Sequence, residues 1–122
     1  MRAPVENVAA TLVIYRGLPF EQEFLYQDAD GYPVDLTGMK GSLTLRRAID
    51  DVEELYTFST FNGKMILANG SIRLIGMNDV ETAEFPAEQA VGHLVVEEVV
   101  GNPLPLAFFL FNVRPVTTGV PL

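Results

Sequence analysis

His93 is the only histidine in this chain of 122 residues, and histidine is the usual proton carrier in nucleophilic catalysis. A serine nucleophile would therefore need His93 as its base, but the sequence has no GxSxG segment to present the serine. His93 follows Gly92 directly, at the beginning of a predicted strand. We interpret it as a strand-end side chain at the sheet margin and assign it no catalytic role.

Neighbouring carboxylates are the second group that could do chemistry, because two of them can act as the acid and base of a glycosidase. The candidates are Glu21 with Glu23, Asp50 with Asp51, Glu53 with Glu54, and Glu97 with Glu98. With 16 acidic residues in the chain, such neighbours carry little information. Successive residues of a strand point to opposite faces, so either Glu97 or Glu98 should lie at the sheet rim or beside an arginine. We expect no enzymatic activity.

The segment DADG, at residues 28–31, has the alternate acidic residues with which an EF-hand calcium loop begins. Such a loop needs Gly at its sixth position and Glu at its twelfth, where this chain has Pro33 and Met39. The segment therefore predicts a turn. The chain has no cysteine for disulfides or thiolate zinc sites, and neither GxxxxGK nor GxGxxG for phosphate. We expect no metal and no cofactor.

The charge of the chain bears on its partners. A net charge of -8 repels a nucleic-acid backbone, and Arg46 with Arg47 is the only adjacent pair of basic residues. No apolar run reaches the roughly 20 residues of a membrane span, and Glu6 and Asn7 stand where a signal peptide needs apolar residues. We expect neither nucleic acid nor a membrane as a partner.

Alternating apolar and polar residues, interrupted by Gly, Pro, Asn and Asp, predict strands through most of the chain. The expected strands cover residues 11–15, 20–27, 39–46, 55–59, 64–68, 71–75, 93–100 and 106–113, with a short extended piece at 32–36. This pattern predicts a mainly β fold, a single domain over 1–122 built as an antiparallel two-layer β-sandwich of the immunoglobulin type. A small closed β-barrel is the alternative. We expect the arms at about 1–9 and 115–122 to be flexible or to order against a partner.

Three connections carry specific signals. Asn69 and Gly70 separate two strands and suit a tight type I′ hairpin turn. Asn78 is a predicted helix N-cap and Pro86 closes the segment, which predicts one helix of two or three turns. The segment GNPLP at 101–105 predicts a loop between the last two strands, because of its Gly and two Pro residues.

The last predicted strand is apolar on both of its faces, although a strand on a sheet with one wet face should alternate. One parity holds Ala107, Phe109, Phe111 and Val113, and we assign it to the core. The other parity holds Leu106, Phe108 and Leu110, together with Asn112 and Arg114. Because of the two polar residues, we expect Leu106, Phe108 and Leu110 to contact another subunit; cover by a helix or loop of the same chain is the alternative.

The region 14–38, IYRGLPFEQEFLYQDADGYPVDLTG, combines an Arg-Gly entry, an aromatic strand, an Asp-Gly turn and a Pro-hydrophobic-Asp-Leu-Thr-Gly step. A strand ending in Arg46 and Arg47 completes the pattern. With these motifs the chain resembles the N-terminal β domain of phage baseplate upper proteins, and similar short tail or accessory proteins of phages and prophages. The residues of the expected double turn are Asp28, Asp30, Gly31, Pro33, Asp35, Leu36, Thr37 and Gly38.

The resemblance implies a non-enzymatic virion structural or assembly protein in the tail, baseplate, neck or capsid. Such a protein is made in the host cytoplasm and docks onto other virion proteins, and we expect it to form a homo-oligomer. The alternative is a β-sandwich module that binds carbohydrate or a host surface through Tyr15, Tyr26, Tyr32 or Tyr56. A small hydrolase that uses Glu98 is a third and weaker hypothesis.

Overall fold

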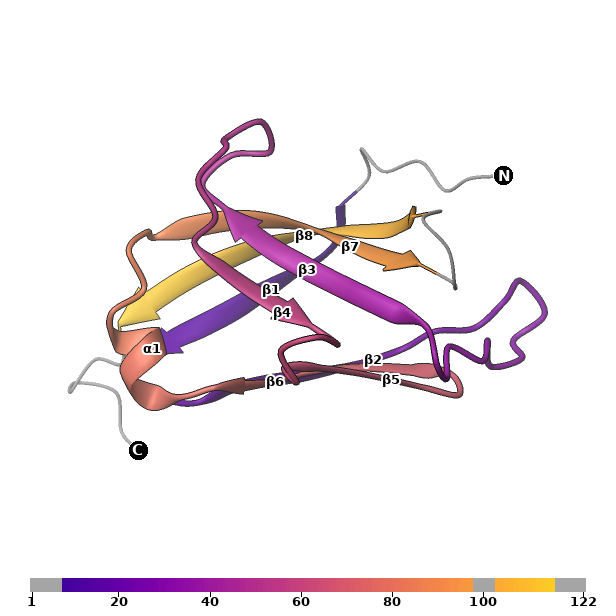
Figure 1. The fold of residues 1–122 in the computed structure, drawn as a ribbon. Coiled ribbons are helices and arrows are strands. Elements are labelled where there is room, and N and C mark those ends of the chain that lie inside the picture. Colours follow the sequence, from indigo (N-terminus) through magenta and orange to yellow (C-terminus); the bar gives the residue numbers. More distant parts are fainter. Residues whose placement is uncertain (1–7, 98–102, 116–122) are drawn as a thin grey trace.

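The computed structural model describes residues 8–97 and 103–115, and their side chains at 10–97 and 108–115. In this part of the chain the fold is mainly β, with one short helix (Figure 1). The elements are β1 (Val8–Arg16), β2 (Phe20–Leu25), β3 (Lys40–Arg46), β4 (Tyr56–Ser59), β5 (Met65–Ala68), β6 (Ser71–Met77), α1 (Asp79–Ala83), β7 (Gln89–Glu97) and β8 (Pro103–Pro115). The predicted arms fall largely outside the described residues.

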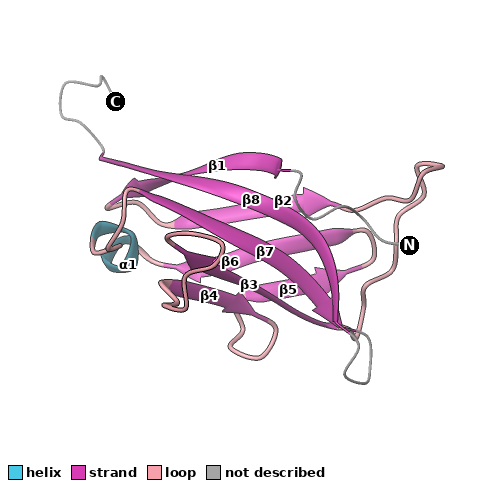
Figure 2. Ribbon diagram, turned by 90° about the horizontal axis from the view of Figure 1, so that it is seen from above, coloured by secondary structure: helices cyan, strands magenta, loops and turns pink. Residues whose placement is uncertain are grey.

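The strands form two sheets that pack face to face, which confirms the sandwich and excludes the closed barrel (Figures 1 and 2). One sheet has the order β1-β8-β7-β3-β4 and the other β2-β6-β5. If the eight strands are lettered A, B, C, C′, D, E, F and G in chain order, the sheets are A-G-F-C-C′ and B-E-D. This is the immunoglobulin arrangement with the first strand moved beside the last. The β1–β8 pair is parallel, and every other described pair is antiparallel.

β3 and β7, two interior strands of the larger sheet, show strict alternation of burial. Leu43 and Leu45 of β3, with Leu94 and Val96 of β7, point into the core, while their sequence neighbours point outward. Position 92 also faces inward, and it is a glycine because a Cβ there would lie 2.8 Å from Leu43 Cδ1. The core that fills the space between the sheets also includes Ile14, Phe20, Phe58, Ile72, Leu74, Met77, Phe109 and Phe111.

The helix α1 has five residues, so the predicted length of two or three turns is wrong. Its beginning is as predicted: the Asn78 side chain accepts from the Glu81 N–H, and the Glu81 carboxylate accepts from the Asn78 N–H. The early end has two causes. Pro86 disfavours helical backbone at the residue before it, and the Phe85 side chain must enter the core, where it is buried.

The predicted hairpin at Asn69 and Gly70 is confirmed, since Ala68 pairs with Ser71, but its predicted turn type is wrong. A type I′ turn needs positive φ at both central residues, but only Gly70 has it (φ 80°), which fits a type II turn. Asn69 instead pairs with Asp35 in a β-bridge. Of the predicted 101–105 loop, residues 103–105 belong to β8, which begins at Pro103, and residues 101–102 lie outside the described part of the chain. A register shift between Leu94 and Val95 puts an irregularity opposite this proline-rich part of β8, where a strand tolerates proline.

Candidate docking face

The outward side of the five-stranded sheet carries an apolar stripe that runs from the edge strand β1 across β8 to β7. We call this surface the docking face; its apolar members are Val13, Tyr15, Val91, Val95 and Leu110. Tyr15 and Leu110 are 47% and 37% exposed, and the three valines are half-buried. The second sheet packs against the opposite side (Figure 2), so these side chains are not part of the core.

Strand register joins the members of the docking face into rows. Thr11 lies beside Leu110, Leu110 beside Val91, and Val91 beside Arg46, so one row crosses four strands. Since paired residues on one face of a sheet are about 4.5–5.5 Å apart, the aliphatic side chains are neighbours. Polar residues close the rows: Arg46 lies at one end of this row, and Gln89 bonds to Asn112 (3.4 Å) in the next. An apolar centre with a polar rim is typical of protein interfaces.

Phe108 lies on the same side of β8 as Leu110, but it is only 9% exposed. Its ring packs on His93, with the ring centroids 5.0 Å apart and the planes tilted by 52°. Ile49, in the connection between β3 and β4, lines a cavity of about 10 Å³ together with these two rings. The Phe108 side chain is therefore largely covered within its own chain, while the Leu110 side chain is open. The third residue expected in the interface, Leu106, has its side chain outside the described residues.

His93 lies on the outward face of β7, opposite Thr44 of β3, whose hydroxyl is hydrogen-bonded to that of Thr57 (3.3 Å). Its Nε2 is buried and makes no hydrogen bond to any described group. The cavity next to it has about the volume that one water molecule needs. This location, in the middle of β7, differs from the strand-end position expected from the sequence, because β7 begins four residues earlier, at Gln89.

A recess of about 580 Å³ adjoins the docking face at the end of β8. Arg16, Glu88, Gln89, Asn112 and Arg114 line it, with the adjoining backbone of β8. Charges of both signs at the margin of an apolar stripe favour directional contacts with a polar partner.

The DADGYPVDLTG segment connects β2 to β3 at the end of the sandwich opposite α1 (Figure 1). Asp28 Oδ1 accepts hydrogen bonds from the N–H groups of Asp30 (2.9 Å) and Tyr32 (3.0 Å). Asp35 Oδ1 accepts from the Thr37 N–H (3.0 Å), and hydrogen bonds from the Thr37 hydroxyl and N–H lower the pKa of Asp35. These carboxylates hold backbone turns, which is a structural use of the acidic residues.

The remaining residues of this segment attach it to the body of the domain. Leu36 is buried in the core, and Gly31 and Gly38 have positive φ (87° and 84°). Pro33 lies against Gly70, whose N–H donates to the Val34 carbonyl (2.8 Å). The segment is thus a double turn fastened to the β5–β6 hairpin.

Of the neighbouring carboxylates considered as catalytic pairs, Glu53 and Glu54 form ion pairs with arginines. Glu53 forms an ion pair with Arg47 (2.7 Å) and Glu54 with Arg46 (3.4 Å), across the connection between β3 and β4. Glu21 and Glu23 lie on the exposed side of β2, Glu97 ends β7, and Glu98 lies outside the described residues. Over 8–97 and 103–115, no three His, Asp or Glu side chains are close enough together to hold a metal ion.

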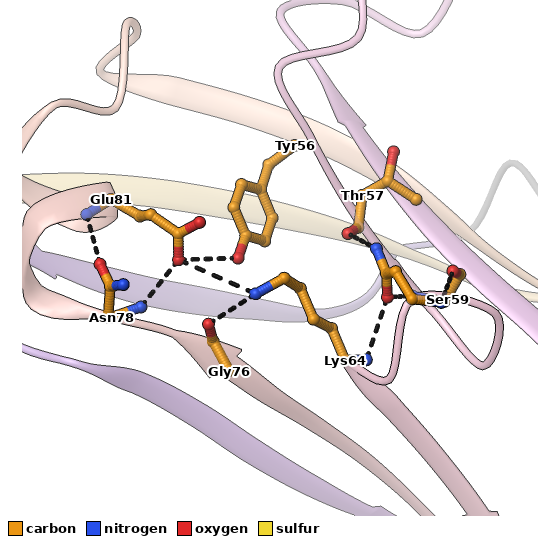
Figure 3. Close-up of polar contacts among 8 residues, drawn as sticks. Tyr56, Thr57, Ser59, Lys64, Gly76, Asn78 and Glu81 are labelled. Carbon is orange, nitrogen blue, oxygen red and sulfur yellow. Dashed lines mark hydrogen bonds and ion pairs between the residues drawn. The ribbon is translucent and has the colours of Figure 1, made fainter.

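A polar cluster at the β4 edge of the larger sheet, which is the edge opposite β1, joins both sheets to α1 (Figure 3). Glu81 Oε1 accepts from the Tyr56 hydroxyl (3.0 Å) and lies 4.0 Å from Lys64 Nζ. Lys64 Nζ also donates to the Gly76 carbonyl (2.8 Å). Burial, then the hydrogen bond to the negatively charged Glu81, raise the pKa of Tyr56. We interpret this cluster as a structural clamp, because each of its polar groups is already bonded within the chain.

The four tyrosines considered for carbohydrate stacking do not form one platform. Tyr56 belongs to the clamp, and Tyr26 packs against the core. Tyr15 is the second-last residue of β1, the strand that contacts α1, while Tyr32 belongs to the turn segment at the opposite end of the sandwich (Figure 1).

Arg16 is the residue whose role the sequence did not reveal. Its guanidinium donates to the carbonyls of Phe85 (2.6 Å) and Ala87 (3.0 Å), which are 69 and 71 residues away in the sequence. In the sequence, only the Arg-Gly motif drew attention to Arg16, and the motif does not indicate which backbone groups the side chain binds.

No described helix is both long and apolar enough to cross a membrane. A scan against protein-family models and a search of curated proteins found no match to this chain.

Proposed function

We propose that the chain is a non-enzymatic structural or assembly protein of a bacteriophage particle, and that it works by docking. Its partners are other virion proteins and further copies of itself. Two observations support the proposal: the motifs between Arg16 and Arg47 resemble those of phage baseplate upper proteins, and the docking face presents an apolar stripe with a polar rim. The docking face carries the proposal, because it supplies the contact that such a role needs.

The exposure of Leu110 is the observation with the greatest weight. The outer face of an antiparallel sheet that meets only water is usually polar. Here Leu110 lies between Thr11 and Val91 in one row, and Val13 and Tyr15 continue the apolar surface along β1. Burying such a stripe against a partner stabilises a complex by roughly 25 cal/mol per Å² of apolar surface removed from water, before the costs of association.

The test replaces Leu110 by a charge and measures how much of the chain enters particles. We expect Leu110→Glu to lower the amount found by mass spectrometry in purified virions at least about tenfold, which corresponds to roughly 1.4 kcal/mol of lost docking energy. The matched control is Ile66→Glu. Ile66 is 40% exposed, slightly more than Leu110, but it lies on β5 in the other sheet.

Circular dichroism of both purified variants shows whether they fold like the wild type. Equal incorporation of Leu110→Glu and wild type would remove the docking face from the proposal. If the wild-type chain itself is missing from purified particles, the structural role in the virion is wrong.

A further inference from the structure

β1 differs from the other three outermost strands of the sandwich. β4 and β5 have only four residues each, and β2 carries the exposed carboxylates of Glu21 and Glu23. Short length and exposed charge are two ways in which proteins prevent an outermost strand from pairing with another chain. β1 has nine residues, VAATLVIYR, with no acid, lysine, proline or glycine. It is the longest outermost strand and carries neither protection.

The two features of β1 that could interrupt pairing lie at its ends. A register shift between Val8 and Ala10 leaves the strand regular from Ala10 onward. At the other end, the Tyr15 carbonyl accepts from the Leu18 N–H (3.1 Å), and the Arg16 side chain turns to the backbone after α1. The stretch between them has β8 as its only strand partner among residues 8–97 and 103–115. Its other edge presents backbone groups that suit β-strand addition.

We propose that this edge pairs with β1 of a second copy, antiparallel and about a two-fold axis at Leu12. An antiparallel pair of identical strands is self-complementary, which is the requirement of a two-fold dimer. Charge also favours β1 as the contact between two copies. The net charge of -8 opposes contact through surfaces that carry acidic side chains, and β1 has no acidic residue.

The position of the axis predicts the contacts. Thr11 of each copy lies opposite Val13 of the other, so two pairs of β-branched side chains form on the outward side. The larger sheets of the two copies then become one continuous sheet, and their docking faces lie next to each other. This inference goes beyond the proposed function, because the contact is made by the backbone edge of β1; of the docking-face members, only Val13 takes part in it.

Association is measured by sedimentation equilibrium together with amide hydrogen exchange. We expect a concentration-dependent dimer of the wild-type chain, with slower exchange in Ala10–Ile14 as the concentration rises. Thr11→Lys and Val13→Glu should each weaken the dimer about tenfold, because each places two like charges diagonally across the new strand pair. An equal mixture of the two variants should restore association, since the introduced lysine then faces the introduced glutamate.

Two controls separate the edge from other surfaces. Ile66→Lys adds a lysine to the outermost strand β5 and should keep the wild-type dimer. Leu110→Glu should reduce docking into particles but keep the dimer at physiological salt, where charges more than about 8 Å apart are screened.

Three results would overturn the inference. One is a chain that remains monomeric up to roughly 1 mM, the range of very weak binding. The second is protection of the β1 amides that does not change with concentration, since the edge is then covered within one chain. The third is a mixture of Thr11→Lys and Val13→Glu that associates no better than either variant alone.

Discussion

Gly70 shows how one residue can hold a whole segment in place. It has a positive φ of 80°, and its N–H and carbonyl bond to Val34 and Tyr26, on either side of the first of the two turns. A Cβ at this position would lie 2.6 Å from the Cβ of Pro33. Backbone conformation and close approach therefore both require glycine here.

Gly31 provides a matched control for this requirement. It also has positive φ (87°), but a Cβ there would meet no atom within 4 Å. We expect Gly31→Ala to lower the free energy of unfolding by about 1–2 kcal/mol, the cost of left-handed backbone for a residue with a side chain. Gly70→Ala should cost about 2–4 kcal/mol, because Pro33 must also move. Urea unfolding followed by circular dichroism measures both; equal costs would contradict the role given to Pro33.

At the scale of elements, α1 is too short to be stable alone and depends on its contacts with β1 and with the turn that follows β1. The Thr82 hydroxyl donates to the Leu18 carbonyl (2.9 Å) and accepts from the Gly17 N–H (3.0 Å). Thr82 is also fully buried. One hydroxyl thus satisfies two backbone groups in the turn between β1 and β2.

Replacing this hydroxyl by a methyl group tests how much it stabilises the joint. Thr82→Val should lower the free energy of unfolding by about 1–3 kcal/mol, because the Gly17 N–H and the Leu18 carbonyl each lose a buried partner. Thr57→Val is the control, since the Thr57 hydroxyl makes one contact of 3.3 Å with Thr44 on the outward side of the sheet. We expect it to stay within about 0.5 kcal/mol of wild type in the same denaturation experiment. If the two variants unfold alike, α1 is not held by Thr82.

The sequence predicted the elements better than the connections between them. Alternation identified β3 within one residue of its observed start, because a period of two follows from having one face in the core. The hairpin at Asn69 was right but its turn type and the length of α1 were wrong, since the Asp35–Asn69 bridge and the burial of Phe85 are tertiary contacts. The apolar parity of Phe109 and Phe111 correctly indicated the core, but the cover of Phe108 depends on His93 and on a distant loop.

At the scale of the whole molecule, the clamp of Tyr56, Lys64 and Glu81 links one sheet to the other (Figure 3). Tyr56 comes from β4 in the larger sheet, whereas Lys64 precedes β5 in the smaller one. Both side chains contact the carboxylate of Glu81, which lies in α1. The clamp therefore depends on the protonation of the Tyr56 hydroxyl, which must donate to a carboxylate.

The pKa of Tyr56 is higher in the folded chain than in the unfolded chain, where it is near 10. Its contribution to stability is therefore complete below about pH 10 and is lost as the pH rises further. We expect the free energy of unfolding of the wild type to fall more steeply above about pH 10 than that of Tyr56→Phe. Tyr32→Phe is the control, because Tyr32 is 68% exposed and far from the clamp in the fold. Parallel curves for wild type and Tyr56→Phe in urea titrations at pH 9–11 would contradict this prediction.

The parallel pair of β1 and β8 also has a mechanical consequence. The two strands run in the same direction from Val8 and Phe108 to Arg16 and Pro115. Tension applied at Val8 and at Pro115 would slide one strand lengthwise past the other. The hydrogen bonds between them then carry the load together, in shear, instead of opening one after another. A domain held in this way resists extension most strongly along the line that joins those two points.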